Sequence, residues 1–90
     1  MKELEITAKK DLLNILERYL ECGLTEQIKI DAEKVYLGYL PAQQLIRPDL
    51  YRFVGCLFPL AYPYLMPVTG VPPTKEKVKE LIEELKKIKL

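Results

Sequence analysis

The chain has 90 residues, of which 49% are hydrophobic and 30% are charged, and its formal net charge at pH 7 is +1. This length and composition predict a single globular domain over residues 1–90 and argue against a disordered or multidomain chain. The near-zero net charge argues against strong electrostatic attraction to nucleic acid or to an anionic membrane. Abundant Lys, Glu, Leu and Ile, without His or Trp, give the chain a thermophile-like composition.

The N-terminal segment and the cysteines bear on the cellular compartment. The segment MKELEITAKKDL has no apolar core, so we expect no signal peptide there. A domain of this size that depends on disulfide bonds usually has more than two cysteines. We therefore expect a cytoplasmic protein in which Cys22 and Cys56 are reduced and buried. A single disulfide bond between them is the alternative.

The first predicted element is a helix over residues 8–22. We expect Thr7 to cap its N-terminus and Gly23 to take the left-handed conformation that follows many helices. The apolar residues recur at helical spacing on one side of the helix. They are Leu12, Leu13, Leu16, Tyr19 and Leu20.

Residues 25–40 have two interpretations. Read as a helix, the segment is capped by Thr25 and carries an apolar stripe that includes Ile28, Ala32 and Tyr39. Read as a short β-hairpin over 27–40, it alternates apolar and polar residues before a turn. The segment has no Asn-Gly or Asp-Gly turn signal, so we favour the helix and with it an αα-hairpin over residues 8–40.

Prolines divide the next part of the chain. Pro41 ends the previous element, and Pro48 suits the first position of a helix that continues to Phe58. Pro59 limits that helix, because a proline inside a helix removes a hydrogen bond and clashes with the preceding turn. The apolar residues of this helix share one face: Leu50, Phe53, Val54 and Leu57.

Residues 53–74 carry no charge but contain five prolines. A membrane span needs about 20 apolar residues in an unbroken helix, and these prolines argue against one. We expect an irregular connection between two helices, which either covers a small core or forms in part an interface for another protein molecule. The interface is suggested because aromatic and Met side chains are enriched at such contacts. The predicted interface residues are Phe58, Tyr62, Tyr64, Leu65 and Met66.

The last predicted element is an amphipathic helix that Thr74 caps and that runs to the C-terminus. Its polar side alternates lysine with glutamate. The glutamates weaken the positive electrostatic potential that would attract the phosphates of nucleic acid. Its apolar stripe is expected to face the αα-hairpin or a second copy of the chain. The stripe comprises Val78, Leu81, Ile82, Leu85 and Ile88.

Residues suited to catalysis or to ligand binding are scarce. The chain has no His and no Ser, and Cys22 and Cys56 are too isolated for a zinc site, so we predict no catalytic residue, no metal and no cofactor. Arg47, Tyr51 and Arg52 cluster at a predicted helix N-terminus and form a candidate anion-binding site. The alternative is that Asp49 pairs with Arg52 and supports the helix start.

The sequence therefore predicts a small, mainly α-helical domain. It contains an αα-hairpin, a proline-rich irregular apolar connection and a C-terminal amphipathic helix. We expect a non-enzymatic interaction or structural protein that binds itself as a homo-oligomer or docks on a larger protein. The alternatives are a nucleic-acid-associated regulator that uses the lysine-rich last helix, and a small-molecule-binding domain with a tyrosine-lined pocket.

Overall fold

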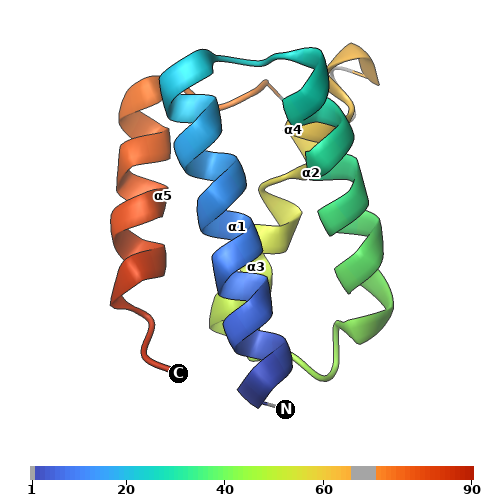
Figure 1. Cartoon of the computed structure of the whole chain (residues 1–90), viewed down its shortest axis with the longest axis vertical. Coiled ribbons are helices and arrows are strands. Elements are labelled where there is room, and N and C mark those ends of the chain that lie inside the picture. The colour runs from blue at the N-terminus through green and yellow to red at the C-terminus, as the bar shows by residue number, and fades with distance from the viewer. Residues whose placement is uncertain (1, 66–70) are drawn as a thin grey trace.

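The computed structural model describes residues 2–65 and 71–90, and every regular element in these ranges is helical. The chain runs alternately up and down as an antiparallel bundle, with both termini at one end (Figure 1). This arrangement confirms the mainly α fold. The α-helices are α1 (Lys2–Cys22), α2 (Glu26–Tyr39), α3 (Pro48–Gly55), α4 (Phe58–Ala61) and α5 (Lys75–Lys87). Two 3₁₀-helices lie at Leu40–Ala42 and Pro63–Leu65.

Helix α1 is longer than the sequence predicted. It begins at Lys2 and passes through Thr7, so the assignment of Thr7 as its N-cap was wrong. The residues before Thr7 continue the same face, because Leu4 packs against the core one turn before the buried Ala8. At the other end Gly23 has φ of 77° and its N–H donates to the Tyr19 carbonyl at 2.8 Å, which confirms the predicted helix stop.

Helix α2 settles the ambiguity over residues 25–40, and the β-hairpin at 27–40 was the wrong alternative. Thr25 caps the helix, since its hydroxyl accepts a hydrogen bond from the Ile28 N–H at 3.1 Å. Ile28, Ala32 and Tyr39 are buried, as the apolar stripe predicted. The helix follows α1 after a short turn, so the two form the expected αα-hairpin.

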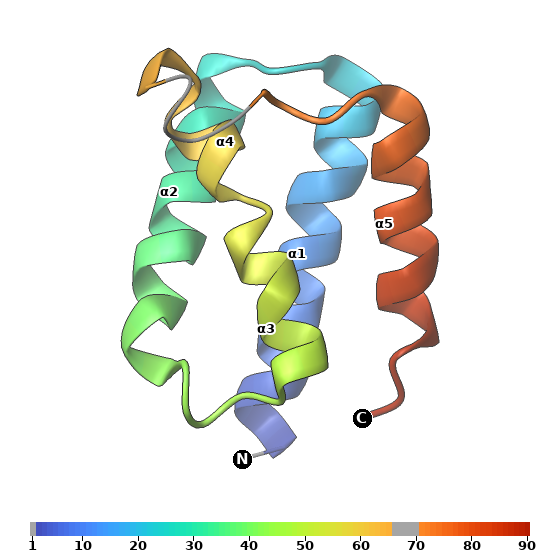
Figure 2. The same cartoon turned by 180° about the vertical axis from the view of Figure 1, so that it is seen from behind.

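The third rod of the bundle is broken into α3 and α4, which follow one another and lie in front of α1 and α2 in the view of Figure 2. Pro48 starts α3 and Pro59 lies in the first turn of α4, where a proline sacrifices no helical hydrogen bond. The prediction that the helix continues to Phe58 was wrong, since α3 ends at Gly55 and Phe58 begins α4. The proline-rich segment is thus more regular than expected. Residues 66–70 of this segment lie outside the described residues.

Helix α5 matches its predicted start and face, but the prediction that it runs to the C-terminus was wrong, since the helix ends at Lys87 and Ile88 has an extended backbone. Thr74 accepts a hydrogen bond from the Lys77 N–H at 3.3 Å, and the stripe of Val78, Leu81, Ile82 and Leu85 is buried.

The tail that follows α5 is hydrogen-bonded to the rest of the fold. Lys9 donates to the Ile88 carbonyl at 2.6 Å, and Arg47 donates to the Lys89 carbonyl at 2.7 Å.

The core lies between these rods. Helix α1 contacts α2, α3 and α5, while α2 also packs along α4. Both cysteines are free thiols, but Cys22 is exposed and Cys56 is half-buried, so the expectation that both are buried was wrong for Cys22. The largest side chains that are almost fully buried are Leu12, Ile15, Leu16, Ile28, Leu50, Phe53, Val54, Leu57, Leu60, Val78 and Leu85.

Candidate functional site

A row of four aromatic rings lies where α4 packs along α2, and we call it the aromatic row. Tyr36 of α2 stands 5.2 Å from Phe58, measured between ring centroids. Phe58 stands 5.5 Å from Tyr62, and Tyr62 stands 6.3 Å from Tyr64, both in edge-to-face arrangements. Such separations and angles are those at which aromatic side chains attract one another. The row therefore holds its members in fixed relative positions.

The row passes from the core to the surface. Phe58 and Tyr62 are half-buried, whereas Tyr64 is 74% exposed and the adjacent Leu65 is 42% exposed. Burial and a hydrogen bond to Glu33 of α2 raise the pKa of the Tyr62 hydroxyl, so this group stays protonated across the physiological range. Tyr64, at the exposed end of the row, is thus supported by neighbouring rings that are themselves packed or hydrogen-bonded.

Helix α2 carries two exposed aliphatic side chains, and one of them, Ile30, lies beside the row. Ile30 and Leu37 are 47% and 49% exposed. They are seven residues apart, so they lie two turns apart on one side of the helix. Ile30 also lines a hollow of about 130 Å³ together with Tyr64. We call the combined surface the aromatic–aliphatic face; it comprises Ile30, Tyr36, Leu37, Phe58, Tyr62, Tyr64 and Leu65.

The face contains four of the five interface residues that the sequence predicted. Phe58, Tyr62, Tyr64 and Leu65 come together there, while Met66 lies outside the described residues. Sequence reasoning missed the contribution of α2. The spacing of Ile30 and Leu37, on the side away from the buried Ile28, was the signal that could have revealed it.

A second surface feature lies between α3, α4 and α5, and we call it the Cys56 pocket. Its volume is about 290 Å³, and it was not predicted because its walls come from separate parts of the chain. Burial raises the pKa of the Cys56 thiol, whose Sγ donates to the Arg52 carbonyl at 3.4 Å. The described residues that line the pocket are Cys56, Pro59, Val71, Pro73, Lys77 and Leu81, with no tyrosine among them.

A third hollow of about 220 Å³ lies between α1 and α2 and has polar walls. Arg18 and Asp31 pair across it at 2.7 Å, and Arg18 also donates to Asn14. The hydrogen bond from Arg18 lowers the pKa of the Asp31 carboxyl. Asp11, which also lines the hollow, accepts a hydrogen bond from the Tyr39 hydroxyl at 2.8 Å. These groups satisfy one another's hydrogen bonds and charges, so the contacts across the hollow hold α1 and α2 together.

The candidate anion-binding residues lie on and just before α3, but their charges are engaged. Arg47 pairs with Asp49 at 2.7 Å through two hydrogen bonds, and Arg52 pairs with Glu84 of α5 at 2.6 Å. Tyr51 is half-buried. The alternative that Asp49 pairs with Arg52 was wrong in its partner, since Asp49 pairs with Arg47 instead. None of the three hollows described here is lined by Arg47, Tyr51 or Arg52.

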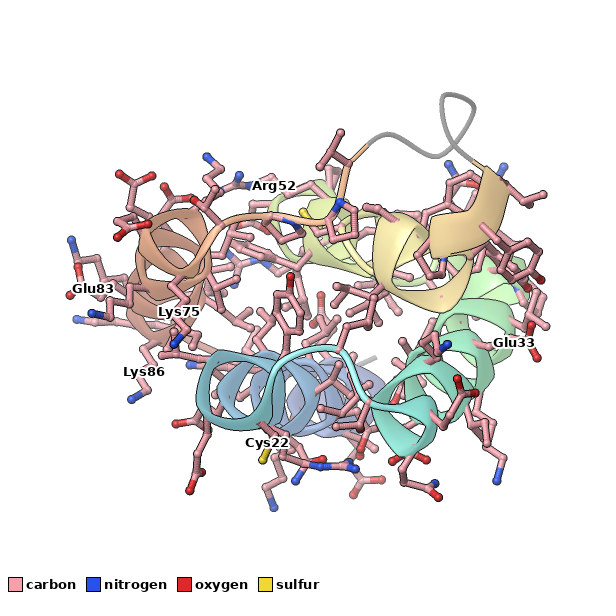
Figure 3. The ribbon with its side chains drawn as sticks, turned by 90° about the horizontal axis from the view of Figure 1, so that it is seen from above. Cys22, Glu33, Arg52, Lys75, Glu83 and Lys86 are labelled. Carbon is pink, nitrogen blue, oxygen red and sulfur yellow. The ribbon has the colours of Figure 1, made fainter. Side chains whose placement is uncertain are left out.

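The lysine-rich helix α5 presents a surface of mixed charge. Lys75, Glu83 and Lys86 point outward from it (Figure 3). Lys77 and Glu80 lie 3.8 Å apart, and Lys86 lies 3.8 Å from Glu17 of α1. Glutamates therefore stand beside the lysines along the face that nucleic acid would contact.

The chain matches no family model, no curated protein and no solved structure. Over residues 2–65 and 71–90, His, Cys, Asp and Glu side chains form no group of three or more that could hold a metal ion. In the same ranges no helix combines the length and the apolar character needed to cross a lipid bilayer.

Proposed function

We propose that this protein is a non-catalytic interaction or structural protein that self-associates through the aromatic–aliphatic face. The observation that carries the proposal is the exposed end of the aromatic row, where Tyr64 stands 74% exposed beside Leu65 and Ile30. Exposed apolar side chains scattered singly need no explanation, but a contiguous group of them marks a contact site.

A second copy of the chain is the partner that fits the charges around this face. Glu26, Lys29 and Glu33 stand beside the face on α2, and Glu26 pairs with Lys29. Charges of both signs therefore border the face, so two copies of it meet without a strong repulsion. An isologous dimer, in which the same surface of both copies meets across a two-fold axis, is the simplest assembly of this kind.

The packing of the face lowers the cost of such a contact. Tyr62 is held by its neighbouring rings and by its hydrogen bond to Glu33, so it loses little further freedom on docking. Tyr side chains also supply a large contact area with few rotatable bonds. These features favour a preformed surface over one that orders only when a partner binds.

Sedimentation equilibrium tests the proposal. The wild-type protein should show a mass that rises with concentration toward twice the 10.5 kDa of one chain. Changing Leu37 and Tyr64 together to Asp should give a folded monomer, because both side chains are exposed and the new charges would be buried only in the assembly. Circular dichroism checks that the variant keeps its helical content.

Ile6→Asp is the matched control, since Ile6 is an exposed apolar residue of α1 outside the face. This variant should associate as the wild type does. A wild-type protein that stays monomeric at high concentration would refute self-association. Equal dissociation of the control and the double variant would refute the assignment to this face.

A further inference from the structure

The Cys56 pocket is separate from the aromatic–aliphatic face and has walls of a different kind. Pro59 of α4, Pro73 before α5 and Leu81 of α5 supply its apolar surface. The Cys56 thiol adds to this surface, because a neutral buried thiol behaves as a small hydrophobe. A volume of about 290 Å³ lies at the lower end of the range for small-molecule sites, so the pocket suits a small ligand.

One cation stands among the lining residues that the structure describes. Lys77 belongs to the first turn of α5, where the helix dipole also favours a negative charge. Its contact with Glu80 is long, at 3.8 Å, and both side chains are more than half exposed. An exposed pair of this kind contributes little, so Lys77 can turn toward a ligand at small cost.

The other charges near the pocket are already committed to one another. Arg52 and Glu84 both act on the Cys56 thiol, but they pair with each other at 2.6 Å. Lys77 is therefore the positive group that a ligand in the pocket would meet. An apolar cavity with one available cation at its edge is complementary to an apolar body that carries one negative charge.

We propose that the Cys56 pocket binds a small aliphatic carboxylate. The hydrocarbon part lies against Pro59, Pro73 and Leu81, and the carboxylate group lies at Lys77. The ligand occupies the space in front of the Cys56 thiol. This site operates in a single copy of the chain and does not depend on self-association.

Thiol protection tests the proposal with octanoate as the probe. Iodoacetamide alkylates both cysteines at mildly alkaline pH, and mass spectrometry of peptides gives the rate at each one. Octanoate should slow the alkylation of Cys56 by about tenfold at a concentration about ten times its dissociation constant. The exposed Cys22 is an internal control and should react at an unchanged rate.

Lys77→Met tests the role of the cation. The substitution should weaken octanoate binding by about two- to fivefold, as expected for an exposed charge pair. Lys79→Met, on the same helix but outside the pocket, should leave the binding unchanged. Because Lys77 itself lowers the pKa of Cys56, each variant is compared with and without ligand, and never with another variant directly.

Octanol, which has the same chain without the charge, separates the apolar part of the site from the ionic part. It should bind the wild type more weakly than octanoate does and should bind Lys77→Met and the wild type equally. Absence of protection at Cys56, or equal protection at Cys22, would overturn the site. Equal affinity of the wild type for octanol and octanoate would overturn the assignment of a carboxylate ligand.

Discussion

Tyr39 combines a buried ring with a hydroxyl group that reaches a charged partner. The ring belongs to the core, and the hydroxyl donates to Asp11 of α1 at 2.8 Å. Burial, with the nearby Asp11 carboxylate, raises the pKa of this hydroxyl from 10.0 to about 12. A tyrosine was expected in the apolar stripe, but its hydrogen bond depends on the crossing of α1 and α2, which the sequence does not specify.

We expect Tyr39→Phe to change how stability depends on alkaline pH. The folded-state pKa lies above the unfolded value, so the contribution of this group is present below about pH 10 and is lost as the pH rises toward 12. The variant should lose about 1 kcal/mol at neutral pH and should show a shallower decline in that alkaline window. Urea unfolding at a series of pH values measures both effects.

Tyr64→Phe is the control for this experiment, since it removes a hydroxyl from a ring that is 74% exposed. It should change the free energy of unfolding by less than about 0.5 kcal/mol. If the wild type and Tyr39→Phe lost stability in parallel across the alkaline window, the role given to the Tyr39 hydroxyl would be wrong.

Replacing Gly23 or Gly38 by alanine should have opposite effects on the stability of the protein. Gly23 has φ of 77°, a left-handed conformation that costs alanine about 1–2 kcal/mol. Gly38 is exposed within α2 and has no atom within 4 Å of an added Cβ, so alanine there should stabilise the protein by about 0.5–1 kcal/mol. Thermal unfolding of both Gly→Ala variants gives the two signs, and the same sign for both would contradict this reading.

At the scale of elements, the stripe of α5 should dominate the stability of that helix. Leu85 is fully buried and Leu81 is 4% exposed, so Leu81→Ala and Leu85→Ala should each cost about 2–5 kcal/mol. Replacing the exposed Lys79 or Glu83 by alanine should cost less than about 0.5 kcal/mol. Denaturant titration of the four variants checks the contrast, and similar costs in both pairs would refute the burial of this face.

The elements differ in how far the sequence predicted them. Apolar periodicity with Thr74 as a cap was sufficient for the start and face of α5, because both signals are local. The same signals with Thr25 favoured α2 but did not exclude a β-hairpin. The start of α1 was misplaced, since Thr7 has the chemistry of a cap but lies inside a longer helix. The turn of α4 was missed because Pro59 was read only as a residue that ends a helix. A proline in a first turn does not break a helix, and Pro59 takes that position.

The candidate sites depended more heavily on tertiary structure. Phe58, Tyr62 and Tyr64 are near one another in sequence, so their grouping was predictable. Tyr36 joins them only because α2 packs along α4. The Cys56 pocket has no local signature at all, since its walls come from α3, α4, α5 and the residues before α5.

At the scale of the whole molecule, Lys9 links the first helix to the tail after the last one. Its Nζ donates to the carbonyls of Lys86 and Ile88 at 3.3 and 2.6 Å. Lys9→Met should free this tail, so the amide of Ile88, which donates to the Leu85 carbonyl, should exchange with solvent about fivefold faster.

Lys10→Met is the matched variant, because Lys10 is the exposed neighbour of Lys9 on the same helix. Nuclear magnetic resonance follows the exchange of individual amides in both variants. Equal acceleration in the two variants, or none in Lys9→Met, would show that the tail is held by other contacts.

The pairing of α1 with α5 has a consequence for how the protein is made. These helices pack side by side although residues 23–74 separate them in sequence. On the ribosome, the apolar side of α1 is therefore complete long before α5 emerges to cover part of it. The αα-hairpin that α1 forms with α2 can shield some of this surface early, because its contacts are local. The bundle closes only after α5 has emerged, and until then the nascent chain exposes apolar surface that chaperones or other nascent chains can bind.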